Sequence, residues 1–147
     1  MKILIINGPN MNMLGIRQPK IYGSKTYSDL VNYIQDHCDK LGIVAEFYQS
    51  NHEGALVDRI QQAYGNFDGI VMNAAAYTHT SVAIADAIAA VGIPTVEVHI
   101  SDISEREEFR QISYMRKNCV ALCAGHGFDS YIEAIDVIIA LDSRNKG

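Results

Sequence analysis

The chain alternates short apolar runs with amphipathic segments, and this alternation limits its possible folds more than any other feature. The runs are typical of buried strands, whereas the segments between them carry apolar residues at the three- and four-residue spacing of helices. The predicted strands are Lys2–Ile6, Val44–Gln49, Gly69–Asn73, Thr95–His99 and Asn118–Cys123. Strands that alternate with helices favour a parallel sheet with helices on both faces.

Helix signals fall between these strands. Thr26 and Asp29 have the spacing of a capping box, and Ser104 and Glu107 have the same spacing before a short helix. Further helices are predicted over Glu53–Tyr64 and Ser81–Val91 and from Asp129 onward. We therefore expect an α/β fold, a flavodoxin-like three-layer sandwich whose five-stranded parallel sheet has the order 2-1-3-4-5.

Length and charge restrict the function. The chain of 147 residues suits one domain, and 12 basic against 17 acidic residues give a net charge of −5. Because no basic run occurs, we expect no nucleic-acid partner. No apolar run is long enough for a bilayer, and the N-terminus lacks a signal-peptide layout, so a cytoplasmic location is expected. The odd number of cysteines, three, favours reduced thiols over disulfides or a metal site.

A long segment from about residue 8 to 25 follows the first strand and is rich in Gly, Pro and Asn. Long loops inside compact domains are commonly functional lids. This one carries Arg17 and Tyr22, and a guanidinium close to a phenol favours the phenolate, which is a base. The spacing alone leaves open an exposed arginine and a tyrosine packed beneath the loop.

Other polar residues follow the third and fourth strands, whose carboxyl ends meet at one edge of such a sheet. Glu97 and His99 are two apart on one strand, so they point to the same face. A buried glutamate beside an imidazole is typical of an oriented general acid or base, and equally of a structural pair. Asn73 and His79 come just before a predicted helix, whose N-terminus could bind a carboxylate with these two side chains as further donors. Alternatively, the segment is only a loop that caps this helix.

Two further charges have two interpretations each. Asp86 lies on the outward face of its predicted helix, where it is either solvated or reaches a neighbouring subunit. Arg110 ends the short helix after Ser104, and it either clamps a carboxylate or closes a local salt bridge. Arg106 lies within a mixed charge run with three glutamates, which predicts a solvated position.

Five motifs are distributed along the chain: NGPNMNMLGIRQPKIYG from residue 7, SNHEG from residue 50, NAAAYTHTSVAIADA from residue 73, EVHIS from residue 97 and EEFR from residue 107. Together they resemble type II 3-dehydroquinate dehydratase over essentially the whole chain. The resemblance implies a hydro-lyase that converts 3-dehydroquinate to 3-dehydroshikimate without metal or organic cofactor. It implies anti elimination through an enolate, in the shikimate or the quinate pathway.

The resemblance also implies roles for particular residues. Tyr22 matches the base that removes the C2 proton, and Arg17 matches the arginine that favours its phenolate. Asn10 matches the residue that holds a water at the enolate oxygen. His99 matches the general acid for the departing C1 hydroxyl, and Glu97 matches its orienting partner.

Substrate-binding positions follow from the same resemblance. They are matched by Asn73, His79, Ile100, Ser101 and Arg110. Asp86 matches an acidic residue that approaches the site from an adjacent subunit, because the family forms dodecamers built as tetramers of trimers. A single catalytic domain over residues 1–147 is therefore expected. Ala85 departs from the arginine or lysine often found before that acid, which weakens inferences about salt bridges between subunits.

Two other hypotheses remain at this point. One is a flavodoxin-like module that binds a mononucleotide without catalysis, although the 8–25 loop lacks the Gly-Lys-Ser/Thr ending of a phosphate cradle. The other is a scaffold of the same fold without activity. Tight nucleotide binding would distinguish the first hypothesis, and Tyr22→Phe and His99→Ala variants would distinguish the second.

Overall fold

The computed structural model describes residues 1–16 and 24–146. Its strands are β1 (Lys2–Asn7), β2 (Val44–Gln49), β3 (Gly69–Asn73), β4 (Thr95–His99) and β5 (Ala121–Ala124). Its α-helices are α2 (Tyr27–Leu41), α3 (Glu53–Gln62), α4 (Val82–Val91) and α5 (Asp129–Lys146). Short 3-10 helices lie in the loops after β1, β3 and β4 and before β5.

The strands form one parallel sheet in the order β2-β1-β3-β4-β5. In the register of the central strands, Ile5 of β1 lies opposite Phe47 of β2 and Val71 of β3. The predicted α/β fold and strand order are confirmed. The chain moves to opposite sides of the sheet after β1 and after β3, so the loops at these two strand ends diverge and leave a crevice between them.

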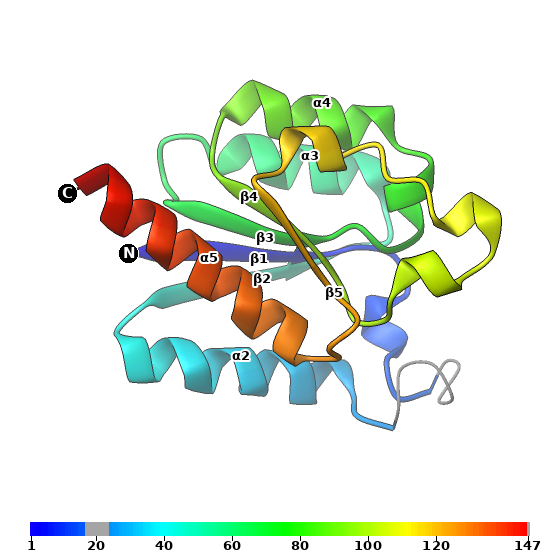
Figure 1. Ribbon diagram of the computed structural model, residues 1–147, viewed down its shortest axis with the longest axis horizontal. Coiled ribbons are helices and arrows are strands. Elements are labelled where there is room, and N and C mark those ends of the chain that lie inside the picture. The colour runs from blue at the N-terminus through cyan, green and yellow to red at the C-terminus, as the bar shows by residue number, and fades with distance from the viewer. Residues whose placement is uncertain (17–23, 147) are drawn as a thin grey trace.

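Helices cover both faces of the sheet, with α2 and α5 on one face and α3 and α4 on the other (Figure 1). The alternation of side chains along β1 explains the two cores. Ile3 and Ile5 belong to the core under α2 and α5, whereas Leu4 and Ile6 belong to the core under α3 and α4. All four side chains are fully buried, as a central parallel strand requires.

The capping predictions were right once and wrong once. Thr26 and Asp29 form a reciprocal capping box at the start of α2, with hydrogen bonds of 2.9 and 3.2 Å. Ser104 does not pair with Glu107. Instead, Asp102 accepts from the backbone N–H of Ser104 at 2.9 Å and from its hydroxyl at 2.6 Å. An aspartate two residues before Ser104 can form this short-range turn, and its carboxylate accepts the hydrogen bond of the Ser104 hydroxyl in place of the predicted cap.

The last strand begins later than predicted, at Ala121 instead of Asn118. The residues before it form the 3-10 helix η5 (Arg116–Asn118), and the Asn118 side-chain amide donates to the carbonyl of Ala85 on α4 at 2.8 Å. This bond holds η5 against α4. Arg116, at the start of η5, lies beside β4.

The first half of the 8–25 segment packs against the core. Met11 and Leu14 are buried, and η1 (Met11–Met13) is a single turn. Gly15 has φ +86°, and a Cβ there would lie 2.8 Å from the carbonyl oxygen of Ser24. Only glycine permits this backbone conformation and close approach. The two described ends of the segment therefore meet at Gly15 and Ser24.

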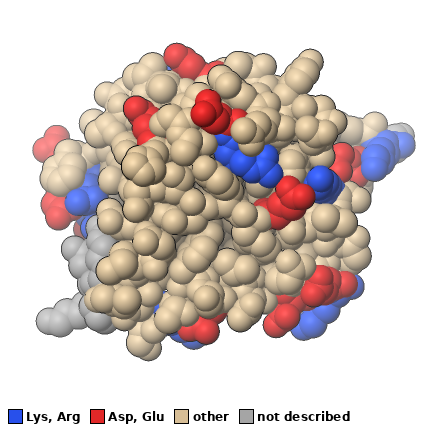
Figure 2. Space-filling model, turned by 180° about the vertical axis from the view of Figure 1, so that it is seen from behind, with Lys and Arg blue, Asp and Glu red and all other residues tan. Residues whose placement is uncertain are grey.

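The surface gives no sign of a charged docking face on the side seen in Figure 2. There, Lys and Arg side chains lie beside Asp and Glu side chains, within a surface that is mostly uncharged. Among the described residues, no helix is both long and apolar enough to cross a membrane.

Candidate functional site

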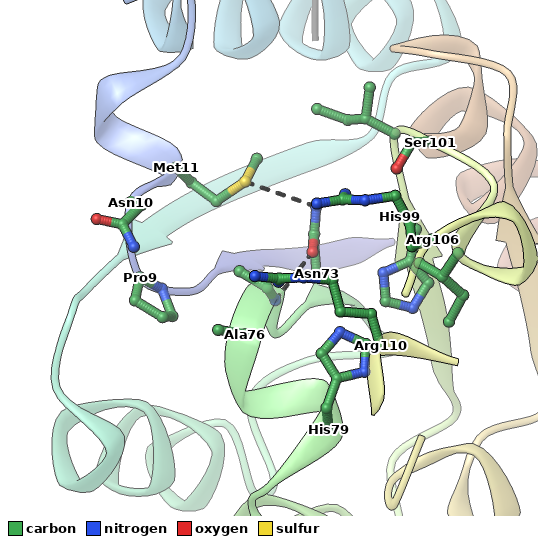
Figure 3. A pocket seen from close by; sticks show the side chains of 13 residues that line it. Pro9, Asn10, Met11, Asn73, Ala76, His79, His99, Ser101, Arg106 and Arg110 are labelled. Carbon is green, nitrogen blue, oxygen red and sulfur yellow. Dashed lines mark hydrogen bonds between the residues drawn. The ribbon is translucent and has the colours of Figure 1, made fainter. Parts of the chain in front are cut away.

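A cavity of about 50 Å³ lies beyond the carboxyl ends of β1, β3 and β4. Figure 3 shows the side chains around it, with Asn10 on the side opposite His79 and His99. Seven residues predicted from the sequence line this cavity: Asn10, Asn73, His79, His99, Ile100, Ser101 and Arg110. The remaining lining residues are Pro9, Met11, Ala75, Ala76, Ile103 and Arg106. The fold therefore gathers segments far apart in the sequence into one site.

Close backbone packing sets the distance between the loops after β1 and β3. The backbone N–H of Gly8 donates to the carbonyl of Asn73 at 2.8 Å. A Cβ on Gly8 would collide with the carbonyl of Ala74, which is backbone and has no rotamer to yield. The glycine thus brings Asn10 to the same cavity as Asn73.

Two non-glycine residues among the described residues of these loops have a left-handed backbone conformation. Asn10 has φ 68° and Ala75 has φ 52°. For alanine this conformation is strained and persists only where its surroundings enforce it. Here the side-chain oxygen of Asn73 accepts from the N–H of Ala75 at 3.0 Å, and the side-chain oxygen of Asn51 accepts from the N–H of Asn10 at 3.0 Å. Both bonds hold the backbone that lines the cavity.

Glu97 and His99 do point to the same face of β4, as the two-residue spacing predicted. Nε2 of His99 donates to Oε2 of Glu97 at 2.5 Å, and the Glu97 side chain is fully buried. An anionic carboxylate accepts the Nε2 proton and so fixes the tautomer and orientation of the imidazole. The other ring nitrogen, Nδ1, is then the one available to a ligand in the cavity.

Arg116 is a third member of this group. Its Nε donates to Oε1 of Glu97 at 3.1 Å, and its Nη2 donates to Oε2 at 3.1 Å. This two-point contact matches the fork of the guanidinium to both carboxylate oxygens. The sequence interpretation missed Arg116, because nothing in the spacing links residues 97 and 116.

These contacts decide the charge of Glu97. Burial by itself raises the pKa of the Glu97 carboxyl, but hydrogen bonds and charges from His99 and Arg116 outweigh burial and lower this pKa. The carboxylate is therefore anionic near neutral pH. The opposite happens nearby, where burial and the Glu97 charge together raise the pKa of the Cys119 thiol to about 12.

His79 enters the cavity from η2 (Ala75–His79). Its Nδ1–H donates to the carbonyl oxygen of Ile112 at 2.7 Å. Burial lowers the pKa of His79, the hydrogen bond to Ile112 partly opposes this, and the charges of His99 and Arg110 lower it further. A neutral His79 therefore presents Nε2 to the cavity as a hydrogen-bond acceptor.

Asn73 is held from behind by a buried polar network. Its side-chain N–H donates to the Tyr131 hydroxyl at 3.0 Å, and that hydroxyl donates to the side-chain oxygen of Asn7 at 2.5 Å. Tyr131 lies on α5 and is fully buried, and burial strongly raises the pKa of its phenol. The phenol is therefore neutral and can donate and accept at once.

Two arginines line the side of the cavity formed by the loop after β4. Arg110, on η4 (Glu108–Arg110), forms the predicted local ion pair with Glu107 at 2.8 Å and also lines the cavity. Arg106 was predicted to be solvated, and this was wrong. It lines the cavity because η3 (Ile103–Glu105) turns the chain back toward the sheet.

Among the described residues, two predicted site residues, Glu97 and Asp86, do not line this cavity. Asp86 is exposed on the outer side of α4, as its position in the helix predicted, and it does not line the cavity of its own subunit. Arg17 and Tyr22 lie outside the described residues. Within residues 1–16 and 24–146, no three His, Cys, Asp or Glu side chains form a group able to hold a metal ion.

Comparisons with known proteins identify the family of this chain. The sequence model of the family described as Dehydroquinase class II matches residues 1–139. The chain is 51% identical to a 3-dehydroquinate dehydratase of Clostridium acetobutylicum over 94% of this chain and 96% of the relative. It is 52% identical to a catabolic 3-dehydroquinase of Aspergillus clavatus over 98% of this chain and 95% of the relative.

Solved structures show the same likeness. The crystal structure of the type II dehydroquinase of Butyrivibrio crossotus superposes with a TM-score of 0.93 and 55% sequence identity, covering 95% of this chain and 97% of that one. The type II dehydroquinase of Propionibacterium acnes gives a TM-score of 0.89 at 37% identity over 94% and 96% of the two chains. The protein therefore belongs to the class II dehydroquinase family and is a hydro-lyase of that family.

Proposed function

We propose that this chain dehydrates 3-dehydroquinate to 3-dehydroshikimate by anti elimination through an enolate. The observation that carries the proposal is the buried Glu97–His99 pair, which ends β4 at the cavity between the loops after β1 and β3. Removal of a proton next to a carbonyl needs a base and a stabilised enolate, and loss of hydroxide needs an acid on the other side.

The acid side of the reaction rests on described residues. His99, as an imidazolium, donates one N–H to Glu97 and gives the other proton to the C1 hydroxyl, which leaves as water. Asn10 lies across the cavity from His99 and is assigned the water at the enolate oxygen. Asn73, His79, Ile100, Ser101 and Arg110 are assigned substrate contacts because all of them line the cavity.

The base side rests on the family's motif. Tyr22, as phenolate, removes the C2 proton, and the electron pair of that C–H bond moves into the enolate. A phenol has an ordinary pKa of about 10, so a nearby cation is required for a base at neutral pH, and Arg17 is assigned that role. The proposed catalytic domain is the single unit 1–147, with residues 8–25 as its lid. Gly15 and Ser24 bring the described ends of that lid together.

The proposal includes a homo-oligomer, a dodecamer built as a tetramer of trimers. Asp86 supports a shared site, because it is exposed on α4 and lies outside the cavity of its own subunit. A cytoplasmic location also forms part of the proposal. The thiols of Cys38, Cys119 and Cys123 are free, which fits a reducing compartment. Light scattering on the purified protein measures the subunit number.

The decisive experiment mixes purified protein with 3-dehydroquinate and follows the enone absorbance of the product. We expect turnover without added metal, and turnover that persists after treatment with a chelator. Tyr22→Phe and His99→Ala should each abolish most of kcat while the proteins stay folded. If wild type forms no enone, the proposed reaction is wrong. If both variants keep full activity, the assigned acid and base are wrong.

The flavodoxin-like binding module is tested by the same preparation. Its absorption spectrum would reveal a copurified flavin, and calorimetry with mononucleotides would reveal binding. The described lining offers two histidines, two arginines and two asparagines at separate strand ends instead of a glycine-rich phosphate loop, which favours the dehydratase.

A further inference from the structure

We propose that Arg116 is a positioning residue for catalysis, which acts through Glu97 to align His99 and to adjust how firmly His99 holds its proton. This inference rests on the proposed function, in which His99 is the general acid. Arg116 does not line the cavity, so it has no direct route to the substrate among the described contacts. In these contacts, Arg116 can influence His99 only through the carboxylate of Glu97.

The two oxygens of Glu97 accept hydrogen bonds from different sets of donors. Oε2 accepts from Nε2 of His99 at 2.5 Å and from Nη2 of Arg116 at 3.1 Å, whereas Oε1 accepts from Nε of Arg116. A carboxylate gripped at one oxygen alone can rotate about its last bond. Because Arg116 grips both oxygens, that rotation is blocked, and the imidazole is held in one plane.

Arg116 is much more exposed than the two side chains it supports. The side chain of Glu97 is fully buried and that of His99 is 6% exposed, whereas that of Arg116 is 42% exposed. A substitution at Arg116 is therefore made at the protein surface and leaves no closed cavity. It changes the arginine that forms an ion pair with the buried carboxylate.

Removal of the Arg116 charge should change the proton affinity of the Glu97–His99 pair in one direction. A buried anion that loses a cationic partner binds protons more strongly, and so does the pair it forms with His99. The last proton of the pair should then leave at higher pH, and the imidazolium becomes a poorer proton donor. Among the described residues, the other groups that interact with the pair are His79 on η2, which Arg110 on η4 also influences, and Cys119 after η5. A substitution at residue 116 leaves all three residues in place.

The test compares Arg116→Gln and Arg116→Lys with wild type over the pH profile of kcat. For Arg116→Gln we expect the maximal kcat to fall about tenfold or more, with KM nearly unchanged, and the alkaline limb to move to higher pH. Lysine restores the charge without the fork. Arg116→Lys should therefore return the alkaline limb toward wild type but recover kcat only in part.

Arg59→Gln is the matched control. Arg59 also pairs with a glutamate, Glu46, at 3.0 Å, but this pair lies on α3 and β2 away from the cavity. Its removal should leave kcat, KM and the pH profile unchanged. A drop in thermal stability common to both Gln variants would then be separated from the effect on catalysis.

An NMR titration of the His99 ring measures the same effect without turnover, with the resonance assigned by His99→Ala. We expect a higher titration midpoint in Arg116→Gln than in wild type. A superimposable titration and an unchanged kcat profile would overturn the inference. If Arg116→Gln does not fold, Arg116→Lys decides, because a wild-type kcat in that variant would show that the fork has no role. Wild-type inactivity would instead refute the proposed reaction and leave the NMR result to judge Arg116.

Discussion

The Tyr131 hydroxyl, on the last helix, accepts a 3.0 Å hydrogen bond from the side chain of Asn73 at the end of β3. The same hydroxyl donates to Asn7 at the end of β1. One buried phenol thus ties together the two strands whose diverging loops form the cavity. Tyr131 lies 58 residues after Asn73 and 124 residues after Asn7 in the sequence. The site is therefore supported by a helix, α5, that contributes none of the residues lining the cavity.

Tyr131→Phe should destabilise the fold and disturb the site together. Its removal leaves a buried donor on Asn73 and a buried acceptor on Asn7 without a partner, which costs about 1–3 kcal/mol for each unsatisfied group. We expect a lower Tm by calorimetry and a higher KM for 3-dehydroquinate. Tyr33→Phe is the control, since its hydroxyl bonds Asp129 on the surface and its loss should change Tm little.

Glu97→Gln should lower kcat strongly while keeping side-chain volume. The amide replaces one of the two acceptor oxygens by an NH2 donor, and that donor would face the N–H of either His99 or Arg116. We expect kcat to fall by about 10²-fold or more, as for loss of a general acid. Steady-state kinetics checks this, and retention of wild-type kcat would show that the carboxylate charge is not needed.

The free energy of unfolding should depend on His79 below neutral pH. Burial lowers the pKa of His79 in the folded state, so the unfolded state binds the proton more readily. Stability from the neutral imidazole is then complete above the unfolded value of about 6.5, and it is lost as pH falls from there through the lower pKa of the folded state. Urea midpoints at pH 7.5 and 5.5 should differ more for wild type than for His79→Gln.

Glu97 affects the free energy of unfolding in a separate and lower pH range. Its pKa is lowered in the folded state, so its stabilising contribution is complete above the unfolded value of about 4.3 and disappears as pH falls through the folded value. Measurements above pH 5 therefore report on His79 without interference from Glu97. An equal pH dependence in wild type and His79→Gln would contradict the assignment to His79.

Gly8→Ala should separate the two loops of the cavity. The added Cβ meets the carbonyl of Ala74, and overpacking of this kind costs about 1–3 kcal/mol. We expect a lower Tm and a raised KM, because Asn10 and Asn73 move apart. Gly54→Ala, within α3, is the control, since its Cβ meets no atom within 4 Å. This second change should be neutral or stabilise by about 0.5–1 kcal/mol.

Shared sites can be tested by subunit mixing. If Asp86 of one subunit completes the site of its neighbour, Asp86→Ala and Tyr22→Phe homo-oligomers should both be impaired. Mixed oligomers would then contain some sites that lack neither group. We expect activity to recover when the two variants are dissociated and reassembled together. Absence of recovery, with light scattering showing mixed oligomers, would place Asp86 outside the catalytic unit.

Local pattern determined most of the fold. The spacing of apolar residues in the helices, the continuous apolar strands and the Thr26–Asp29 capping box follow from short-range sterics and hydrogen bonds, so they were predictable. The strand order followed as well, because right-handed crossovers leave few ways to arrange five parallel strands. The same pattern placed Glu97 and His99 on one face, since strand side chains alternate with a period of two.

Tertiary structure decided what contacts those side chains. The fork from Arg116 to Glu97 depends on the placement of η5, which the bond from Asn118 to Ala85 holds against α4. Arg106 at the cavity and Tyr131 behind Asn73 likewise result from chain segments distant in sequence. Local spacing contains no information about such pairs, because their energies arise only when the packed sheet and helices bring the groups together.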